Sequence, residues 1–204
     1  MTSVSPKKLQ TIEWNRKKIL QKERGFLVLD FGSQLTQLIA RRLRELQFYS
    51  EVHPYNLSLD KIKAMNPLGI ILSGGPSSVY EPGSPKRNVQ ELIEVAPVLG
   101  ICYGMQLLTH QLGGQVEKAE NREYGYQTVS WTKPFGRTPK EQKVWMSHGD
   151  VVKKIPNNFE LVATTNHHPA AIKSDRVWAL QFHPEVAHTE HGIEILRAYA
   201  EDLC

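Results

Sequence analysis

Cysteine is scarce in this sequence: Cys102 and Cys204 are the only two among 204 residues. Two cysteines are too few for a disulfide scaffold, and so low a count favours a reducing, cytoplasmic setting. Long apolar runs are missing as well, because no stretch reaches the roughly 18 residues that a membrane-spanning helix needs. The N-terminus has no apolar segment of the kind that secretory signals carry. We therefore expect a cytoplasmic protein with no membrane partner.

Net charge is small outside the N-terminal segment. Residues 1–24 hold seven lysines and arginines and two glutamates, a net charge of +5, whereas the whole chain carries +4. The rest of the chain therefore sums to −1, which argues against a nucleic-acid-binding domain. A solvated extension and a nucleic-acid contact both remain open for the basic segment, and we favour the extension. We thus divide the chain into an N-terminal extension, 1–24, and one domain, 25–204, and expect no nucleic-acid partner.

The first half of the chain alternates short apolar runs with helical patterns. The strand-like runs lie at 25–33, 50–55, 69–75 and 97–101. The runs at 25–33 and 69–75 are apolar and end in glycine or serine, and the run at 97–101 is apolar throughout. Continuous apolar runs of this kind are typical of strands buried on both faces of a parallel sheet. Apolar residues at helical spacing occupy 34–47, 58–65, 86–96 and 103–113, with Ser58 expected to cap the second helix and Gly113 to end the fourth. This alternation predicts an α/β fold with a doubly wound, mostly parallel sheet flanked by helices.

The pattern changes after residue 114. Five short strand-like segments follow without helices between them, at 125–131, 143–148, 159–165, 170–174 and 176–182. We expect them to form an antiparallel extension at the edge of the sheet. The chain then closes with a helix over 188–203, whose inward face is expected to carry Ile193, Leu196, Tyr199, Ala200 and Leu203.

Cys102 lies in the sequence GICYG, between a predicted buried strand and a predicted helix. This arrangement is typical of a nucleophile elbow, in which flanking glycines permit a strained turn close to the helix. A thiol at a helix N-terminus is activated by the helix dipole and by free N–H groups. A small buried core residue is the alternative interpretation of Cys102, so the choice depends on whether a base is present.

A base and its orienting group are found in the sequence QFHPEV. His183 follows an apolar strand-like run, and Glu185 lies two residues further on. Residues i and i+2 of an extended segment project to the same side, so the carboxylate can hold one imidazole nitrogen while the other faces Cys102. A single histidine is more often structural than catalytic. The carboxylate at i+2 and the strand-end position together favour a Cys–His–Glu triad.

Backbone donors for an oxyanion are predicted at Gly75 and Tyr103. Gly74 and Gly75 follow a buried strand, and Tyr103 directly follows the predicted nucleophile. N–H groups at these two places can stabilise negative charge on a substrate oxygen. The carboxyl ends of neighbouring strands in an open α/β sheet share one crevice, so both segments are expected to open into it. An ordinary turn is the alternative for the glycine pair.

Two other kinds of site are only weakly indicated. The segment SGGPSS at 73–78 is similar to the S-G-G-x-D-S loop of ATP pyrophosphatases, but the aspartate is missing, and no Walker-type loop occurs. His183, His188 and His191 lie beside acidic residues at a spacing that metal ligation permits. His188 and His191 fall at the start of the predicted last helix, and His183 already has a role. We therefore expect no metal and no ATP in this domain.

Several segments together carry a resemblance to a known family. They are LDFGSQLTQLIARR (29–42), ILSGGPSSVY (71–80), GICYGMQLL (100–108), VWMSHGD (144–150) and QFHPEVAHTEHG (181–192). The chain from 25 to 204 resembles the class I, triad-type glutamine amidotransferases, whose fold is flavodoxin-like, and among them the amidotransferase domains of GMP synthetases. The sequence departs from the family pattern at two places, neither of which is in the triad. Leu35 stands where the family usually has tyrosine, and residues 122–126 read REYGY in place of REFGY.

The resemblance implies a role for each matching residue. Cys102 matches the nucleophile, His183 the general base and Glu185 the third triad member, while Gly75 and Tyr103 match the oxyanion hole. The residues implied at the glutamine site are Gly74, Gln106, Ser147, His148 and Asp150.

The resemblance also implies a reaction and a partner. L-glutamine is hydrolysed to glutamate and ammonia through a Cys102 thioester, without a cofactor in this domain. The ammonia passes to an ATP-pyrophosphatase synthetase domain or subunit, which uses ATP and Mg to convert XMP to GMP. The family's usual enzyme continues into that synthetase, so an excised domain and a separate subunit both remain open. An amidotransferase of another pathway, a stand-alone γ-glutamyl hydrolase and a non-enzymatic binding module are the alternatives.

Overall fold

One mixed sheet organises the part of the chain that can be described. The computed structural model describes residues 24–165 and 168–204, whose strands form a nine-stranded sheet in the order β2-β1-β3-β4-β9-β8-β7-β5-β6. The strands from β2 to β9 in this order pair in parallel, and the pairs from β9 to β6 are antiparallel. The predicted α/β fold, with a parallel sheet and an antiparallel extension, is confirmed.

The parallel half is buried on both faces. Its strands are β2 (Ser50–Pro54), β1 (Phe26–Asp30), β3 (Gly69–Leu72), β4 (Val98–Ile101) and β9 (Val177–Leu180). Every residue of β3, β4 and β9 is buried, which explains why these strands are continuous apolar runs rather than alternating ones. The four strands predicted in the first half of the chain all form.

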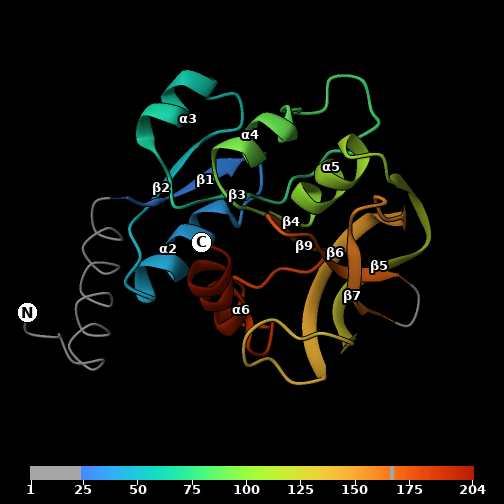
Figure 1. Ribbon diagram of the computed structural model, residues 1–204. Coiled ribbons are helices and arrows are strands. Elements are labelled where there is room, and N and C mark those ends of the chain that lie inside the picture. Colours follow the sequence, from blue (N-terminus) through green and yellow to red (C-terminus); the bar gives the residue numbers. More distant parts are fainter. Residues whose placement is uncertain (1–23, 166–167) are drawn as a thin grey trace, which may run out of the picture.

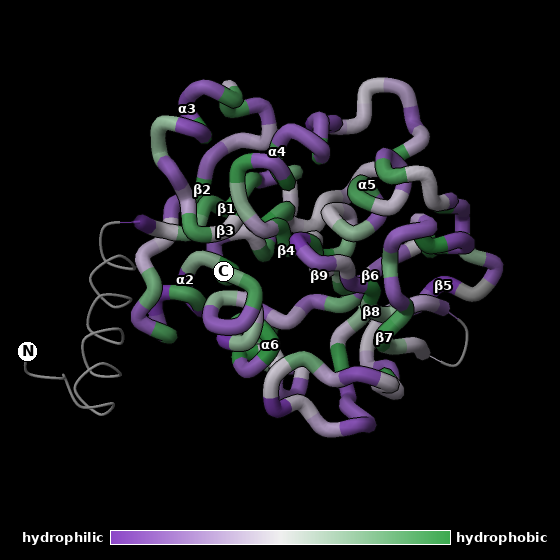
Figure 2. The backbone as a smooth tube through the Cα atoms, viewed as in Figure 1, coloured by the Kyte–Doolittle hydropathy of each residue, from purple (hydrophilic) through white to green (hydrophobic). Residues whose placement is uncertain are grey.

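Helices cover both faces of this half (Figure 1). On one face lie α2 (Thr36–Glu45) and α6 (Gly192–Ala198), which continues into the π-helical turn η1 (Tyr199–Leu203). On the other lie α3 (Leu59–Met65), α4 (Val89–Val95) and α5 (Tyr103–Gln111). The buried apolar residues accordingly form two clusters, one under each helical layer. Figure 2 shows the hydrophobic segments gathered at the central strands and polar segments along the outer surfaces of the helices.

The antiparallel half is built on a long hairpin. Its strands are β5 (Gln115–Trp131), β6 (Glu141–Lys154), β7 (Glu160–Thr164) and β8 (Pro169–Lys173). The predicted short segments were wrong in two respects. Residues 115–124 also belong to β5, because they pair along β6 across a register shift between Lys118 and Glu123. The segment at 176–182 contains β9, which pairs in parallel with β4 and antiparallel with β8. It therefore belongs to the parallel half and joins it to the extension.

Two predicted helix ends need correction. The last helix begins at Gly192 rather than at residue 188, and His191 precedes it with φ of +54°. Ser58 occupies the N-cap position of α3, but its side chain makes no capping hydrogen bond. Gly113 follows α5 with φ of +91°, which is the left-handed conformation expected of a glycine that ends a helix.

The predicted N-terminal extension falls almost wholly outside the described residues. Arg24, its last residue, donates hydrogen bonds from its guanidinium group to the carbonyl oxygens of Asn66, at 2.8 Å, and Pro67, at 3.0 Å. None of the helices in residues 24–165 and 168–204 has the length and apolar composition that a membrane-spanning segment requires.

Candidate active site

Cys102 lies on a strained turn between β4 and α5. Its backbone has φ of +53° and ψ of −107°, a conformation that residues other than glycine rarely adopt. The turn is held by the Cys102 N–H, which donates to the Leu180 carbonyl oxygen at 2.7 Å. A Cβ on Gly100 would lie 2.7 Å from the carbonyl carbon of Gly104, and one on Gly104 would clash with the Leu72 carbonyl. The glycines on either side of Cys102 are therefore required for α5 to approach the strands this closely.

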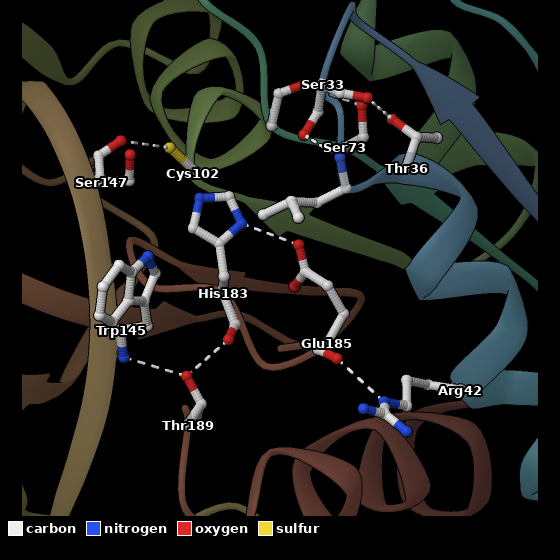
Figure 3. A network of polar contacts seen from close by, with 12 residues as sticks. Ser33, Thr36, Arg42, Ser73, Cys102, Trp145, Ser147, His183, Glu185 and Thr189 are labelled. Carbon is white, nitrogen blue, oxygen red and sulfur yellow. Dashed lines mark hydrogen bonds and ion pairs between the residues drawn. The ribbon is translucent and has the colours of Figure 1, made fainter. Parts of the chain in front are cut away.

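His183 lies between Cys102 and Glu185 (Figure 3). Its Nδ1 is 2.8 Å from Glu185 Oε1, and both side chains are buried. Burial alone would lower the pKa of His183, but the Glu185 carboxylate and a hydrogen bond with Cys102 outweigh this effect and raise the pKa to about 10. The imidazole thus has an anion on one side and the thiol on the other. This is the order of groups in a nucleophile–base–carboxylate triad.

Cys102 and His183 open into a cleft of about 790 Å³, whereas Glu185 is fully buried and does not line it. This volume is within the roughly 300–1,000 Å³ that small-molecule sites commonly have. The cleft lies beyond the carboxyl ends of β1, β3 and β4, and β6 closes it on the side of the antiparallel half. The lining includes Cys102 and His183. Of the remaining predicted site residues, it also includes Gly75, Gln106, Ser147, His148 and Asp150, but not Gly74 or Tyr103.

The two predicted oxyanion donors flank the thiol-bearing turn. Neither the Gly75 N–H nor the Tyr103 N–H donates a hydrogen bond to a backbone or side-chain acceptor in residues 24–165 and 168–204. A Cβ on Gly74 would lie 3.1 Å from His183 Cε1 and 3.6 Å from Cys102 Cβ, so this glycine faces the triad. Gly74 therefore brings backbone, rather than a side chain, up to Cys102 and His183.

The other predicted glutamine-binding residues form one wall of the cleft. Gln106 is buried and donates from Nε2 to the Asp150 carbonyl oxygen at 3.0 Å. Asp150 accepts a hydrogen bond from the Tyr80 hydroxyl at 2.8 Å through its own carboxylate. The Ser147 carbonyl oxygen lies 3.8 Å from Cys102 Sγ. Gln106 thus supports the wall, and its amide is already engaged with the protein.

His148 is part of the cleft lining, but its side chain is almost wholly buried. Its Nε2 lies 3.0 Å from Glu123 Oε2, and its Nδ1 lies 3.0 Å from the Asp150 carbonyl oxygen. Burial raises the pKa of Glu123, but hydrogen bonds from His148 and Thr165 outweigh burial and hold that pKa below its ordinary value. Glu123 was not among the predicted site residues. Its place in REYGY was the only signal in the sequence.

The histidines considered for a metal site are separated. His188 packs against Trp145, with ring centroids 4.7 Å apart, and against Tyr126 at 5.8 Å. His191 is exposed at the start of α6, and His183 is paired with Glu185. No group of three or more histidine, cysteine, aspartate or glutamate side chains positioned to bind a metal occurs in the described part of the chain.

Comparison with known proteins gives the family. The sequence model of the class-I glutamine amidotransferases matches residues 27–203. This chain belongs to the class I glutamine amidotransferase family. The amidotransferase is 60% identical over 182 residues to the glutamine-hydrolyzing GMP synthase of Bdellovibrio bacteriovorus, and 51% identical over 185 residues to that of Bacillus subtilis. These matches cover 89% and 87% of this chain but only 36% of each relative, so the chain spans about a third of the relatives' length.

Solved structures agree with this family. A Thermoplasma acidophilum protein, described provisionally as one subunit of GMP synthase, is 30% identical with a TM-score of 0.78, covering 87% of this chain and 92% of that one. A glutamine amidotransferase from Thermotoga maritima has a TM-score of 0.63 at 22% identity, covering 89% and 84%, and supports the fold alone.

Three residues of the amidotransferase that sequence reasoning missed hold the triad segment (Figure 3). Arg42 Nε, on α2, donates to the Glu185 carbonyl oxygen at 2.9 Å. Thr189 Oγ1 donates to the His183 carbonyl oxygen at 2.6 Å and accepts from the Trp145 N–H at 3.0 Å. Arg42 and Thr189 lie within segments that carry the family resemblance, but nothing in the local pattern indicates which backbone groups they reach.

Proposed function

We propose that this chain hydrolyses L-glutamine to glutamate and ammonia, and that Cys102, His183 and Glu185 perform the reaction. The observation that carries the proposal is the position of His183, between the thiol of Cys102 and the buried carboxylate of Glu185. Membership of the amidotransferase family supports glutamine as the substrate.

The first half of the reaction forms a thioester. His183, whose pKa is raised to about 10, holds the proton from Cys102 as an imidazolium, and the Cys102 thiolate attacks the carbon of the side-chain amide. The oxygen that becomes negative is stabilised by the N–H groups of Gly75 and Tyr103, which have no other acceptor within the described residues. The C–N bond then breaks, and the imidazolium of His183 gives its proton to the nitrogen, which leaves as ammonia.

The second half releases glutamate. His183 takes a proton from water, the resulting hydroxide attacks the thioester carbon, and the C–S bond breaks. The sulfur leaves as the thiolate and His183 keeps the proton, so the site is restored. Glu185 stays ionised throughout and keeps Nδ1 of His183 in the protonated form, so that Nε2 is the nitrogen that exchanges protons. No step requires a metal ion or a cofactor.

We further propose that the ammonia is used in GMP formation. The relatives named GMP synthase are about two and a half times as long as this chain, which supports a partner domain or subunit that consumes ammonia. In this reaction the partner, an ATP-pyrophosphatase, adenylates XMP with ATP and Mg and replaces the adenylate with ammonia. The carboxyl-end cleft is open in this chain, and its Pro76–Ser78 and Ser147–Asp150 rims lie where such a partner can reach the site.

The test compares the native chain with a Cys102→Ala variant. The native chain should release equimolar glutamate and ammonia, and the variant should release neither, although it folds normally. A glutamyl adduct on Cys102 in mass spectra of the quenched reaction should identify the thioester. Adding the synthetase portion of a relative, with ATP, Mg and XMP, should yield GMP. Preferential cleavage of γ-glutamyl peptides would instead show a stand-alone hydrolase, and activity in the variant would refute Cys102 as the nucleophile.

A further inference from the structure

The segment that carries His183 and Glu185 has no regular secondary structure to position it. Strand β9 ends at Leu180 and α6 begins at Gly192, so both triad members lie in the connection between them. Near-attack geometry requires the imidazole to stay at a fixed place relative to Cys102. Some other set of contacts must therefore hold this connection.

Three hydrogen bonds close a ring between this connection and β6. The His183 N–H donates to the Trp145 carbonyl oxygen at 3.2 Å, and the Trp145 N–H donates to Thr189 Oγ1 at 3.0 Å. Thr189 Oγ1 then donates to the His183 carbonyl oxygen at 2.6 Å. A hydroxyl has one hydrogen and can accept as well, so Thr189 fills both roles at once. The ring occupies both backbone polar groups of His183. Figure 3 shows the two hydrogen bonds that the Thr189 hydroxyl makes.

The same stretch of β6 also contacts the thiol. The Ser147 carbonyl oxygen, two residues beyond Trp145, lies 3.8 Å from Cys102 Sγ. Thr189 therefore links the histidine to the strand that lies beside the nucleophile. Thr189 is buried and is not among the residues that line the cleft, so it touches neither the substrate nor the reacting atoms.

We propose that Thr189 is a positioning residue, whose hydroxyl sets the place of His183 relative to Cys102 by bridging the His183 carbonyl and the Trp145 N–H. This inference rests on the proposed function for its kinetic consequences. Valine at 189 matches threonine in shape but can neither donate nor accept, so the ring opens. Serine keeps the hydroxyl and should close it again.

The experiment compares Thr189→Val and Thr189→Ser with a matched control, Thr138→Val. Thr138 is also buried, and its Oγ1 donates to the backbone carbonyl of Phe135 at 2.9 Å. Within the described residues, the Thr138 hydroxyl makes no hydrogen bond to the segment that carries His183 and Glu185. Thr189→Val should lower kcat for glutamine hydrolysis by roughly 10²-fold, the effect of a displacement of about 1 Å, and should leave KM nearly unchanged. Thr189→Ser should recover most of the activity, and Thr138→Val should resemble the native chain.

A second measurement does not depend on glutamine turnover. The rate at which iodoacetamide alkylates Cys102 should change, with a shifted pH profile, in Thr189→Val but not in Thr138→Val, because the His183–Cys102 hydrogen bond is altered. If the native chain hydrolyses glutamine, and Thr189→Val has the same kcat, KM and Cys102 alkylation rate, the positioning role of Thr189 is overturned. If the native chain does not hydrolyse glutamine, the proposed function is refuted. The positioning role of Thr189 would still be supported if the alkylation profile of Thr189→Val differed from that of the native chain.

Folding provides the remaining check. If Thr189→Val does not fold, Thr189→Ala, which is smaller and cannot clash with the His183 carbonyl, replaces it in both measurements. Failure of both variants to fold would also overturn the proposal, since Thr189 would then determine stability rather than the place of the imidazole.

Discussion

His183 Nδ1 lies 2.8 Å from Glu185 Oε1, and the side chains are only 5% and 0% exposed. Glu185 Oε2 is buried as well and has no hydrogen-bond partner within the part of the chain that the structure describes. The carboxylate therefore depends on the imidazole for its stabilisation. Removing one member of such a pair is costly, because it leaves an uncompensated charge in the interior.

His183→Ala should therefore lose both activity and stability. Loss of the base should reduce kcat/KM for glutamine by at least the 10²–10⁴-fold typical of general acid–base catalysis. The free energy of unfolding in urea should fall by about 3–5 kcal/mol, and adding Glu185→Gln should restore part of it. Glu185→Gln alone should cost less activity, since it affects the orientation of His183 and not proton transfer. Equal losses in kcat/KM for the two single variants would mean that Glu185 acts more directly.

The pair should also make stability depend on pH. The pKa of His183 is about 10 in the folded protein, against about 6.5 for an unperturbed histidine, so the folded state binds the proton more tightly. This contribution is fully present below about pH 6.5 and is lost as the pH rises toward 10. The unfolding free energy of the native chain, relative to a His183→Gln/Glu185→Gln double variant, should therefore decline across this range. A constant or rising difference would contradict the raised pKa.

Gly104 should be intolerant of a side chain. Its N–H donates to the Ser73 carbonyl oxygen at 3.1 Å, and a Cβ there would clash with the Leu72 carbonyl. Gly104→Ala should lower the unfolding free energy by about 1–3 kcal/mol, as overpacking does in other interiors. Gly149→Ala is the matched control. The nearest atom to a Cβ at this position would be the Tyr124 hydroxyl oxygen, at 3.6 Å, so a methyl group fits there. Equal melting temperatures for the two variants would disprove the close approach of α5 to β3.

We propose that the domain boundary lies between residues 24 and 25, and a deletion tests it. Removing residues 1–22 should leave kcat and KM for glutamine unchanged, because this basic segment contains none of the proposed site residues. Arg24 is retained, since its guanidinium group binds the carbonyl oxygens of Asn66 and Pro67. A large rise in KM in the shortened chain would show that the segment contributes to the cleft.

Local sequence patterns determined which segments form strands and helices and which side chains were candidates for the active site. Apolar runs buried on both faces predicted β1, β3 and β4, and helical spacing predicted the helices that cover them. Because parallel strands present their carboxyl ends at one edge, Gly75 and Cys102 could be assigned to one cleft without knowledge of the structure. His183 and Glu185 were identifiable as a pair because they are separated by one residue.

The tertiary structure alone decided how these groups are held. Local periodicity does not specify which strands become neighbours, so it could not show that β9 lies beside β4 or that β5 and β6 form one long hairpin. The contacts that follow from this strand order join distant residues: Arg42 to the Glu185 carbonyl, and Trp145 to Thr189. Such hydrogen bonds depend on where a backbone carbonyl or N–H lies in space, and every residue type except proline carries both groups. A sequence can therefore indicate the reacting side chains, whereas the contacts that position them depend on the assembled fold.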